Sequence, residues 1–274
     1  MKEVKVALCL QGTVGNFYTD KKQYQHTEHI DYRIALEHYK KHIFSVNPHV
    51  DVFIHCWNPE YQQQIEKDYL PKISIFEKQI DFSSEIAATG IESSLRNCYQ
   101  KSRWYSQEKV ISLKREYERE NNFKYDYVIV SRFDLAFLKD LKFSNYDNDI
   151  FWAPNDSIDP AESIKTERFL DYWFFSNSET MDLFGTLYTH WNEIQNFKLK
   201  RFPTSRPFME SEPNSHVDSW IHAKALKFEI GYTFKEHEEH DLVRAIYKDC
   251  QYAGDHYKGI ENLQKFETYP KHRF

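Results

Sequence analysis

Glycine and cysteine are scarce in this sequence, and long apolar runs are missing. Only 7 of the 274 residues are glycine, and Gly12 and Gly15 fall in one short segment. The four cysteines stand far apart without a CxxC pair, so the sequence has neither a zinc motif nor a disulfide framework, which indicates a reducing compartment. No apolar run is long enough to cross a bilayer, so no transmembrane segment is expected.

A strong basic charge is also lacking. The formal net charge is −6 and the sequence pI is about 6.1, which argues against a nucleic-acid partner. One local basic run could contact phosphate or an anionic membrane, or could be a solvated loop: Lys198, Lys200, Arg201 and Arg206. The first ten residues include Glu3 and do not resemble a signal peptide. We therefore expect a cytoplasmic protein, and leave open peripheral attachment to the inner face of the membrane.

The composition is that of a globular protein. Hydrophobic residues make up 41% and charged residues 28% of the chain. The length is near the upper end for one hydrophobic core, so we expect a single domain over residues 1–274, with halves at about 1–140 and 141–274. Aromatic residues reach 17%, a surplus that can fill a core or line a sugar-binding cleft.

Apolar runs alternate with segments of helical periodicity. We predict strands at residues 4–10, 51–57, 73–76, 125–131, 149–152 and 172–175. Helices are predicted at residues 31–45, after Pro59, and at 92–120, 178–194 and 216–227. The alternating order predicts an α/β fold, with a mostly parallel central sheet and helices on both faces.

Ligands bind at the carboxyl ends of the strands in such sheets, which selects the segments 11–17, 55–58 and 131–135. The first includes Gln11, Gly12, Thr13 and Gly15. Glycines let backbone N–H groups approach a phosphate closely, although an ordinary turn explains them equally well. The segment matches neither the GxGxxG fingerprint nor the Walker A sequence.

The other two segments contain three further candidates: His55 in one, and Arg132 and Asp134 in the other. His55 could hydrogen-bond a base or ribose, or could be a satisfied core histidine. Arg132 and Asp134 follow the most strand-like run, on one face of the strand if it continues. Asp134 could hold Mn²⁺ or Mg²⁺ against a nucleotide diphosphate. The alternative is an Arg–Asp pair that only rigidifies a turn.

Candidates for acid–base work lie in the second half. Asp171 begins an aromatic strand, and a carboxylate there should have a partner or a chemical task. A polar segment before residue 220 contains Glu210, Glu212, His216 and Asp218. From these we select Asp171, Glu212 and Asp218 as catalytic candidates.

Other polar residues are weaker candidates. Arg244 follows a possible late strand and could contact a diphosphate with its planar guanidinium, as could Arg168 and Arg132. His237 and His240 lack the HExxH spacing and are better explained by a solvated turn.

The segments at 4–17, 51–57 and 125–135 resemble a group of bacterial and viral proteins, identified mostly as glycosyltransferases of surface polysaccharide synthesis. Residues 171–176, with Met181, look like a later strand of that group. The resemblance implies a GT-A-like fold, with Asp134 at the position of the last Asp of a DxD motif. Two positions depart from the pattern: Arg132 stands where the first Asp is expected, and Gly15 stands where an Arg is common.

The expected function is therefore transfer of a sugar from a nucleotide-sugar donor to a glycan or lipid-linked acceptor. The resemblance implies a nucleotide-binding first half and an acceptor-side second half. Two alternatives remain open. A nucleotidyltransferase uses similar chemistry, but usually has a Gly- and Lys-rich first loop. A non-catalytic glycan-binding or scaffold protein could keep the fold without the metal.

Overall fold

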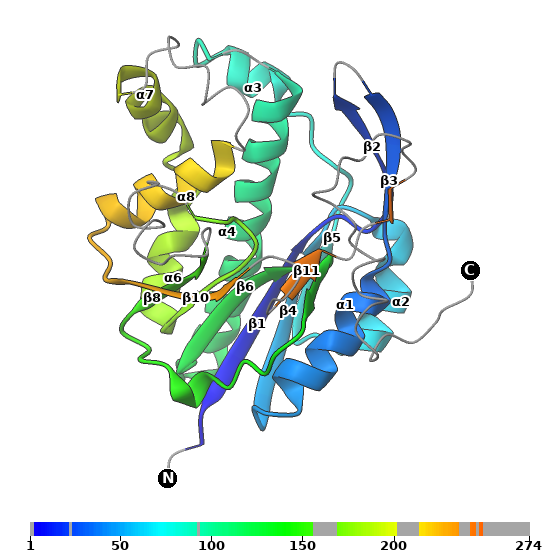
Figure 1. The fold of residues 1–274 in the computed structure, drawn as a ribbon, viewed down its shortest axis with the longest axis vertical. Helices are drawn as coiled ribbons and strands as arrows, with labels where there is room; N and C mark the ends of the chain where they lie inside the picture. Colours follow the sequence, from blue (N-terminus) through cyan, green and yellow to red (C-terminus); the bar gives the residue numbers. More distant parts are fainter. Residues whose placement is uncertain are drawn as a thin grey trace.

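A computed structural model describes residues 3–21, 24–91, 94–155, 169–201, 214–235, 242–244 and 247–248. Its centre is a seven-stranded sheet in the order β10-β8-β9-β6-β1-β4-β5 (Figure 1). The strands are β1 (Lys5–Gly12), β4 (His49–Cys56), β5 (Ile73–Phe76), β6 (Tyr127–Arg132), β8 (Phe151–Asn155), β9 (Phe174–Ser176) and β10 (Ile230–Lys235). The prediction of a mostly parallel sheet is confirmed, with one exception. β9 runs antiparallel to both of its neighbours.

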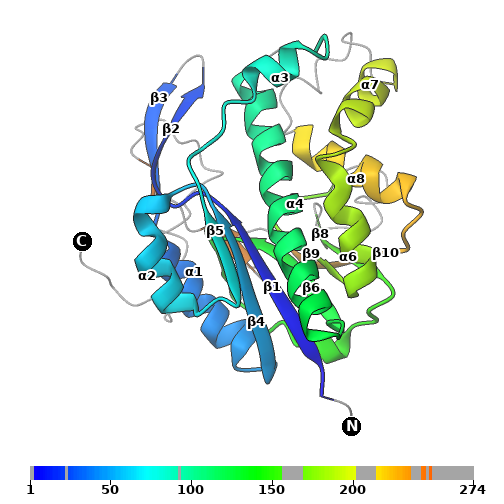
Figure 2. The same cartoon turned by 180° about the vertical axis from the view of Figure 1, so that it is seen from behind.

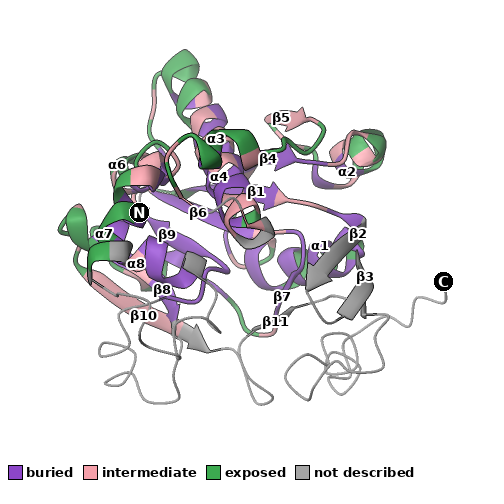
Figure 3. Ribbon diagram, turned by 90° about the horizontal axis from the view of Figure 1, so that it is seen from above, coloured by how far each residue is buried: buried purple, intermediate pink, exposed green. Residues whose placement is uncertain are grey.

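Helices cover both faces of this sheet, as predicted. They are α1 (Tyr32–Tyr39), α2 (Gln62–Tyr69), α3 (Ser83–Ala87), α4 (Leu95–Asn121), α6 (Ser178–Phe184), α7 (Trp191–Arg201) and α8 (Asn214–Ala225). The protein has one hydrophobic core on each face of the sheet. Alternate residues of β1 belong to different cores, because successive strand side chains point to opposite faces. Val6 and Leu8 pack with α1 and α2, whereas Ala7 and Cys9 pack with α4, α6 and α8. Figure 2 shows the α4 side, and Figure 3 shows the sheet buried between exposed helix surfaces.

Several expected elements have different boundaries. The helix predicted at 31–45 continues beyond α1 as a π-helical turn, Lys40–Phe44. The helix predicted at 178–194 is divided into α6, a 3₁₀ turn at Gly185–Leu187, and α7. Gly185 lies so close to Ile111 of α4 that an added Cβ would come within 2.9 Å of the isoleucine side chain. The predicted helix is therefore interrupted at the point where it packs closely against α4.

Two small sheets were not predicted. β2 (Gly15–Lys21) and β3 (Tyr24–Ile30) form an antiparallel pair beyond the carboxyl end of β1, and β12 (Tyr247–Lys248) adds to β3. β7 (Leu135–Phe137) pairs with β11 (Leu242–Arg244). The first turn therefore leads into a hairpin, and the expected late strand near residue 242 is present. None of the described helices is both long and apolar enough to span a membrane.

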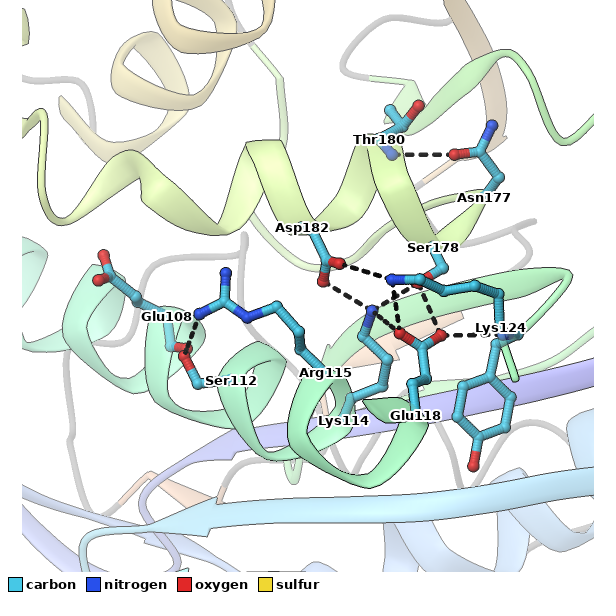
Figure 4. A network of polar contacts seen from close by, with 11 residues as sticks. Glu108, Ser112, Lys114, Arg115, Glu118, Lys124, Asn177, Ser178, Thr180 and Asp182 are labelled. Carbon is cyan, nitrogen blue, oxygen red and sulfur yellow. Dashed lines mark hydrogen bonds and ion pairs between the residues drawn. The ribbon is translucent and has the colours of Figure 1, made fainter. Parts of the chain in front are cut away.

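A buried charge network fixes the second half of α4 (Figure 4). Lys114 is fully buried, and its Nζ lies 2.7 Å from Asp182 and 3.1 Å from Glu118. Glu118 also accepts hydrogen bonds from the Ser178 hydroxyl at 2.7 Å and the Tyr125 backbone N–H at 2.9 Å. Each buried charge thus has several partners, which links α4 to α6 and to the start of β6.

Replacing Lys114 by Met should lower the free energy of unfolding by about 3 kcal/mol, because Glu118 and Asp182 would lose their buried cation and keep only half-exposed Lys124. Arg119→Met on the exposed side of the same helix is the matched control, since Arg119 contacts only exposed Glu116 in the described ion pairs. Urea unfolding of both variants checks the prediction. Equal stability of the two variants would contradict it.

The same network predicts loss of stability in acid. Burial raises the pKa of Glu118, but the Tyr125 N–H, Lys114 and Ser178 together bring this pKa below its ordinary value of 4.5. The contribution is therefore complete above pH 4.5 and is lost as pH falls through the lower folded-state pKa. Glu118→Gln should flatten this part of the curve of unfolding free energy against pH. An unchanged slope in the variant would refute the assignment.

Candidate functional site

Three polar side chains form a row at the carboxyl ends of the central strands. Gln11 of β1 is in register with His55 of β4 and with Arg132 of β6. Ala7 and Cys9 face α4, so the two-residue period places Gln11 on the same face. We call His55, Gln11 and Arg132 the edge row. It lies where ligands bind in open α/β sheets.

Both ring nitrogens of His55 have hydrogen-bond partners within the protein. Its Nδ1 lies 2.7 Å from the Ser106 hydroxyl of α4, and its Nε2 lies 2.8 Å from a Glu77 carboxylate oxygen. Burial lowers the pKa of His55, while Glu77 opposes this shift. Of the two alternatives from the sequence, this geometry favours the satisfied core histidine, because neither ring nitrogen remains for a base or ribose.

Gln11 is different, because its amide is buried without a partner. The residue is only 2% exposed, and neither Oε1 nor Nε2 has a hydrogen-bond partner among the described residues. Gln107 of α4 is fully buried and has the same property. An unsatisfied buried polar group costs about 1–3 kcal/mol, so native proteins contain few of them. The Gln11 amide, at the edge of the sheet, therefore lacks hydrogen bonds that a ligand could supply if the side chains covering it moved aside.

Arg132 and Asp134 form a two-pronged ion pair. Nε and Nη2 of Arg132 donate to the two Asp134 oxygens at 2.8 and 2.7 Å, and Asp134 is 1% exposed. The hydroxyl of Tyr39 donates to the Arg132 carbonyl at 2.6 Å, which fixes the end of β6. The two side chains are brought together as expected, in the geometry of the turn-stabilising alternative.

Asp171 joins this pair to α4 and α8. Because β9 is antiparallel, the residues before it lie at the carboxyl ends of its neighbours. Asp171 lies 3.2 Å from Arg103 Nε, 3.2 Å from His216 Nε2 and 3.8 Å from Arg132 Nη1. Burial raises the pKa of Asp171, but Arg103, His216 and Arg132 outweigh it and hold this pKa well below its ordinary value. The expected partner for this carboxylate is therefore present.

The described residues do not fit a divalent cation. Both Asp134 oxygens are already bound by Arg132, and Arg103 adds a second positive charge at Asp171. In the part of the chain that the structure describes, no three His, Cys, Asp or Glu residues are grouped to hold a metal. Mn²⁺ or Mg²⁺ at Asp134 would have to displace a guanidinium group. The metal at Asp134 stays a prediction without support from this geometry.

The glycine turn after β1 is held by the loop after β4. Asn58 Oδ1 accepts from the Thr13 hydroxyl at 2.5 Å and from the Val14 N–H at 3.0 Å. Gly12 and Gly15 have φ angles of 118° and 70°, which glycine adopts far more readily than other residues. The shape of the turn therefore accounts for both glycines, and phosphate binding there stays a prediction.

Asp218 is separate from the edge row. It is fully buried in α8 and accepts hydrogen bonds from Lys198 at 2.6 Å, Gln195 at 3.0 Å and Trp104 at 3.2 Å. These contacts join α8 to α7 and α4 and favour a structural role. Lys198 is buried in α7, so of the two alternatives for the basic run the solvated loop is wrong for this residue.

The remaining candidates are placed only in part. The backbone of Arg244 lies opposite Leu135, next to Asp134 in the chain. The following candidates lie outside the described residues: Glu210, Glu212, Arg168, Arg206, His237 and His240. Arg103 and Gln107 were not among the residues predicted from the sequence. Two polar residues four positions apart on a buried helix face were the available signal.

Comparison with known proteins adds no assignment. No protein-family model matches the chain, and no curated protein shows significant similarity to it.

Gly15→Ala should destabilise the protein more than Gly90→Ala. The two glycines have nearly equal φ angles of 70° and 75°, so both alanines carry backbone strain. A Cβ at Gly15 would lie 2.5 Å from the Tyr61 hydroxyl, whereas one at Gly90 meets nothing within 4 Å. Thermal unfolding measures the difference. Equal losses would show that Tyr61 moves aside freely.

Proposed function

We propose that this protein is a glycosyltransferase, acting in the cytoplasm on a nucleotide-sugar donor and a glycan or lipid-linked acceptor. The observation that carries the proposal is the unpaired, buried amide of Gln11 in the edge row. It lies at the carboxyl ends of a mostly parallel sheet, where nucleotides bind in related architectures. The seven-stranded mixed sheet agrees with the GT-A-like fold that the sequence resemblance implies.

In this proposal, guanidinium groups stabilise the departing diphosphate. Arg132 has five N–H donors, of which two bind Asp134. Its Nη1 lies 3.8 Å from Asp171 and retains donor capacity for a phosphate oxygen. Asp134 and Asp171 fix the guanidinium plane before a ligand arrives, which reduces the cost of ordering it. This account requires no metal ion, since Arg132 and Arg103 supply the positive charge.

One observation favours a non-catalytic glycan-binding or scaffold protein. Both oxygens of Asp134 accept hydrogen bonds from Arg132, two residues earlier in the chain, as in a turn built only for stability. A scaffold of this kind would not need a donor site, so donor binding distinguishes the two functions.

The test is a thermal-shift screen against UDP-, GDP-, CMP- and dTDP-sugars, each with Mn²⁺ or with EDTA. We expect one nucleotide class to raise Tm in both conditions, since a ligand at 100 times its Kd stabilises the native state by about 2.7 kcal/mol. Gln11→Leu should raise the Tm of the free protein and abolish the donor shift, because it removes an unpaired amide and its ligand contact. Gln100→Leu is the control, being another buried, unpartnered glutamine.

The outcomes separate the alternatives. A donor shift that disappears in EDTA would support the predicted metal and contradict the guanidinium account. A shift that survives Gln11→Leu would remove Gln11 from the donor site. No shift with any donor would support the scaffold.

A further inference from the structure

Asp171 has the position of a general base but the surroundings of a fixed anion. Arg103, Arg132 and His216 all face its two oxygens, at 3.2, 3.8 and 3.2 Å. Arg103 also donates to the backbone carbonyl of Asp171. A carboxylate with three cationic or proton-donating partners is a weak base, because protonation would cost these interactions. The proton of an acceptor hydroxyl therefore needs another destination.

His216 is held beside Asp171 by the backbone. It lies in the first turn of α8, and its carbonyl accepts hydrogen bonds from the Phe169 N–H at 3.1 Å and from the Ser219 hydroxyl at 3.0 Å. These contacts tie the start of α8 to the segment that carries Asp171. The imidazole therefore approaches the carboxylate in one fixed direction, with Nε2 toward Oδ1.

The carboxylate also determines which nitrogen of His216 carries the proton. An ionised carboxylate only accepts hydrogen bonds, so Nε2 is the protonated nitrogen that faces it. In the neutral ring, Nδ1 then keeps its lone pair. Among the described residues nothing hydrogen-bonds to Nδ1, and the side chain is 10% exposed. The arrangement is that of a histidine base oriented by an acidic residue.

We propose that His216 is the general base of the transfer reaction and that Asp171 is its positioning residue. The inference rests on the proposed transferase function. The acceptor oxygen forms a bond to the anomeric carbon of the donor sugar, while the bond from that carbon to the diphosphate oxygen breaks and its electron pair leaves with the diphosphate. The acceptor proton passes to His216 Nδ1. This single displacement inverts the anomeric configuration.

The surrounding charges determine the pH dependence. Arg103 of α4 and Arg132 of β6 face Asp171, and Asp218 of α8 is paired with Lys198 of α7. The arginines keep their charge at all working pH values. A general base accepts a proton only in its unprotonated form, so activity that depends on such a base should rise with pH.

The experiment uses the nucleotide-sugar that raises Tm in the screen, with water as the acceptor. Release of the donor's nucleotide, a nucleoside diphosphate or, from a CMP-sugar, CMP, is followed from about pH 5 to pH 9. His216→Gln should lower the rate by about 10²–10⁴-fold and remove the acidic limb of the profile, with the donor-dependent Tm shift retained. His190→Gln, an exposed histidine outside the site, should leave rate and profile unchanged.

Two further variants guard against a folding defect. Asp171→Asn, assayed at saturating donor because Asp171 also orients Arg132, should lower kcat and change the pH profile, as expected of a positioning residue. His216→Ala should recover activity when free imidazole is added, because imidazole can accept the proton in place of the side chain.

A His216→Gln variant that keeps the wild-type rate and acidic limb would overturn the inference. Wild-type protein that binds donor but releases no nucleotide at any pH would also overturn it. Absence of donor binding in the wild type would instead contradict the proposed function.

Discussion

The buried carboxylate of Asp171 is the constraint on which the site depends. A charge in this position needs compensation, and three elements provide it: α4 through Arg103, β6 through Arg132 and α8 through His216. These partners are distant in sequence, with His216 45 residues away and Arg103 68 residues away. One side chain therefore connects the two halves of the chain at the carboxyl ends of the strands.

The helix α4 contacts both the site that contains Asp171 and a separate buried charge network. Its first half supplies Arg103, Ser106 and Gln107 to the edge of the sheet, and its second half supplies Lys114 and Glu118 to a buried charge network. The contacts at the two ends differ in kind. The charges of the Lys114–Glu118 network are paired, as in a structural element, whereas the buried amides of Gln11 and Gln107 have no hydrogen-bond partner among the described residues. Rigid packing at one end thus supports incompletely satisfied groups at the other, as expected where a site gives up stability for function.

The central strands were predictable from the sequence because buried parallel strands are continuous apolar runs, and residues 73–76 match β5 without change. The rule for carboxyl ends then located Gln11, His55 and Arg132 before any contact was known. The direction of β9 was not predictable, because a three-residue strand, Phe174–Ser176, carries no sequence signal for parallel or antiparallel pairing. The β2–β3 hairpin lacks an Asn-Gly or Gly-containing turn pair, which is the usual local signal.

The roles of individual polar residues were the least predictable, because they depend on long-range partners. His55 and Asp218 are surrounded by protein donors and acceptors that no local pattern reveals.

The most direct test of the central claim is a crystal structure with the nucleoside diphosphate of the stabilising donor, grown in EDTA. The account predicts the diphosphate within hydrogen-bond distance of Arg132 and a ligand contact to Gln11. A nucleotide bound elsewhere, with both side chains unchanged, would contradict it.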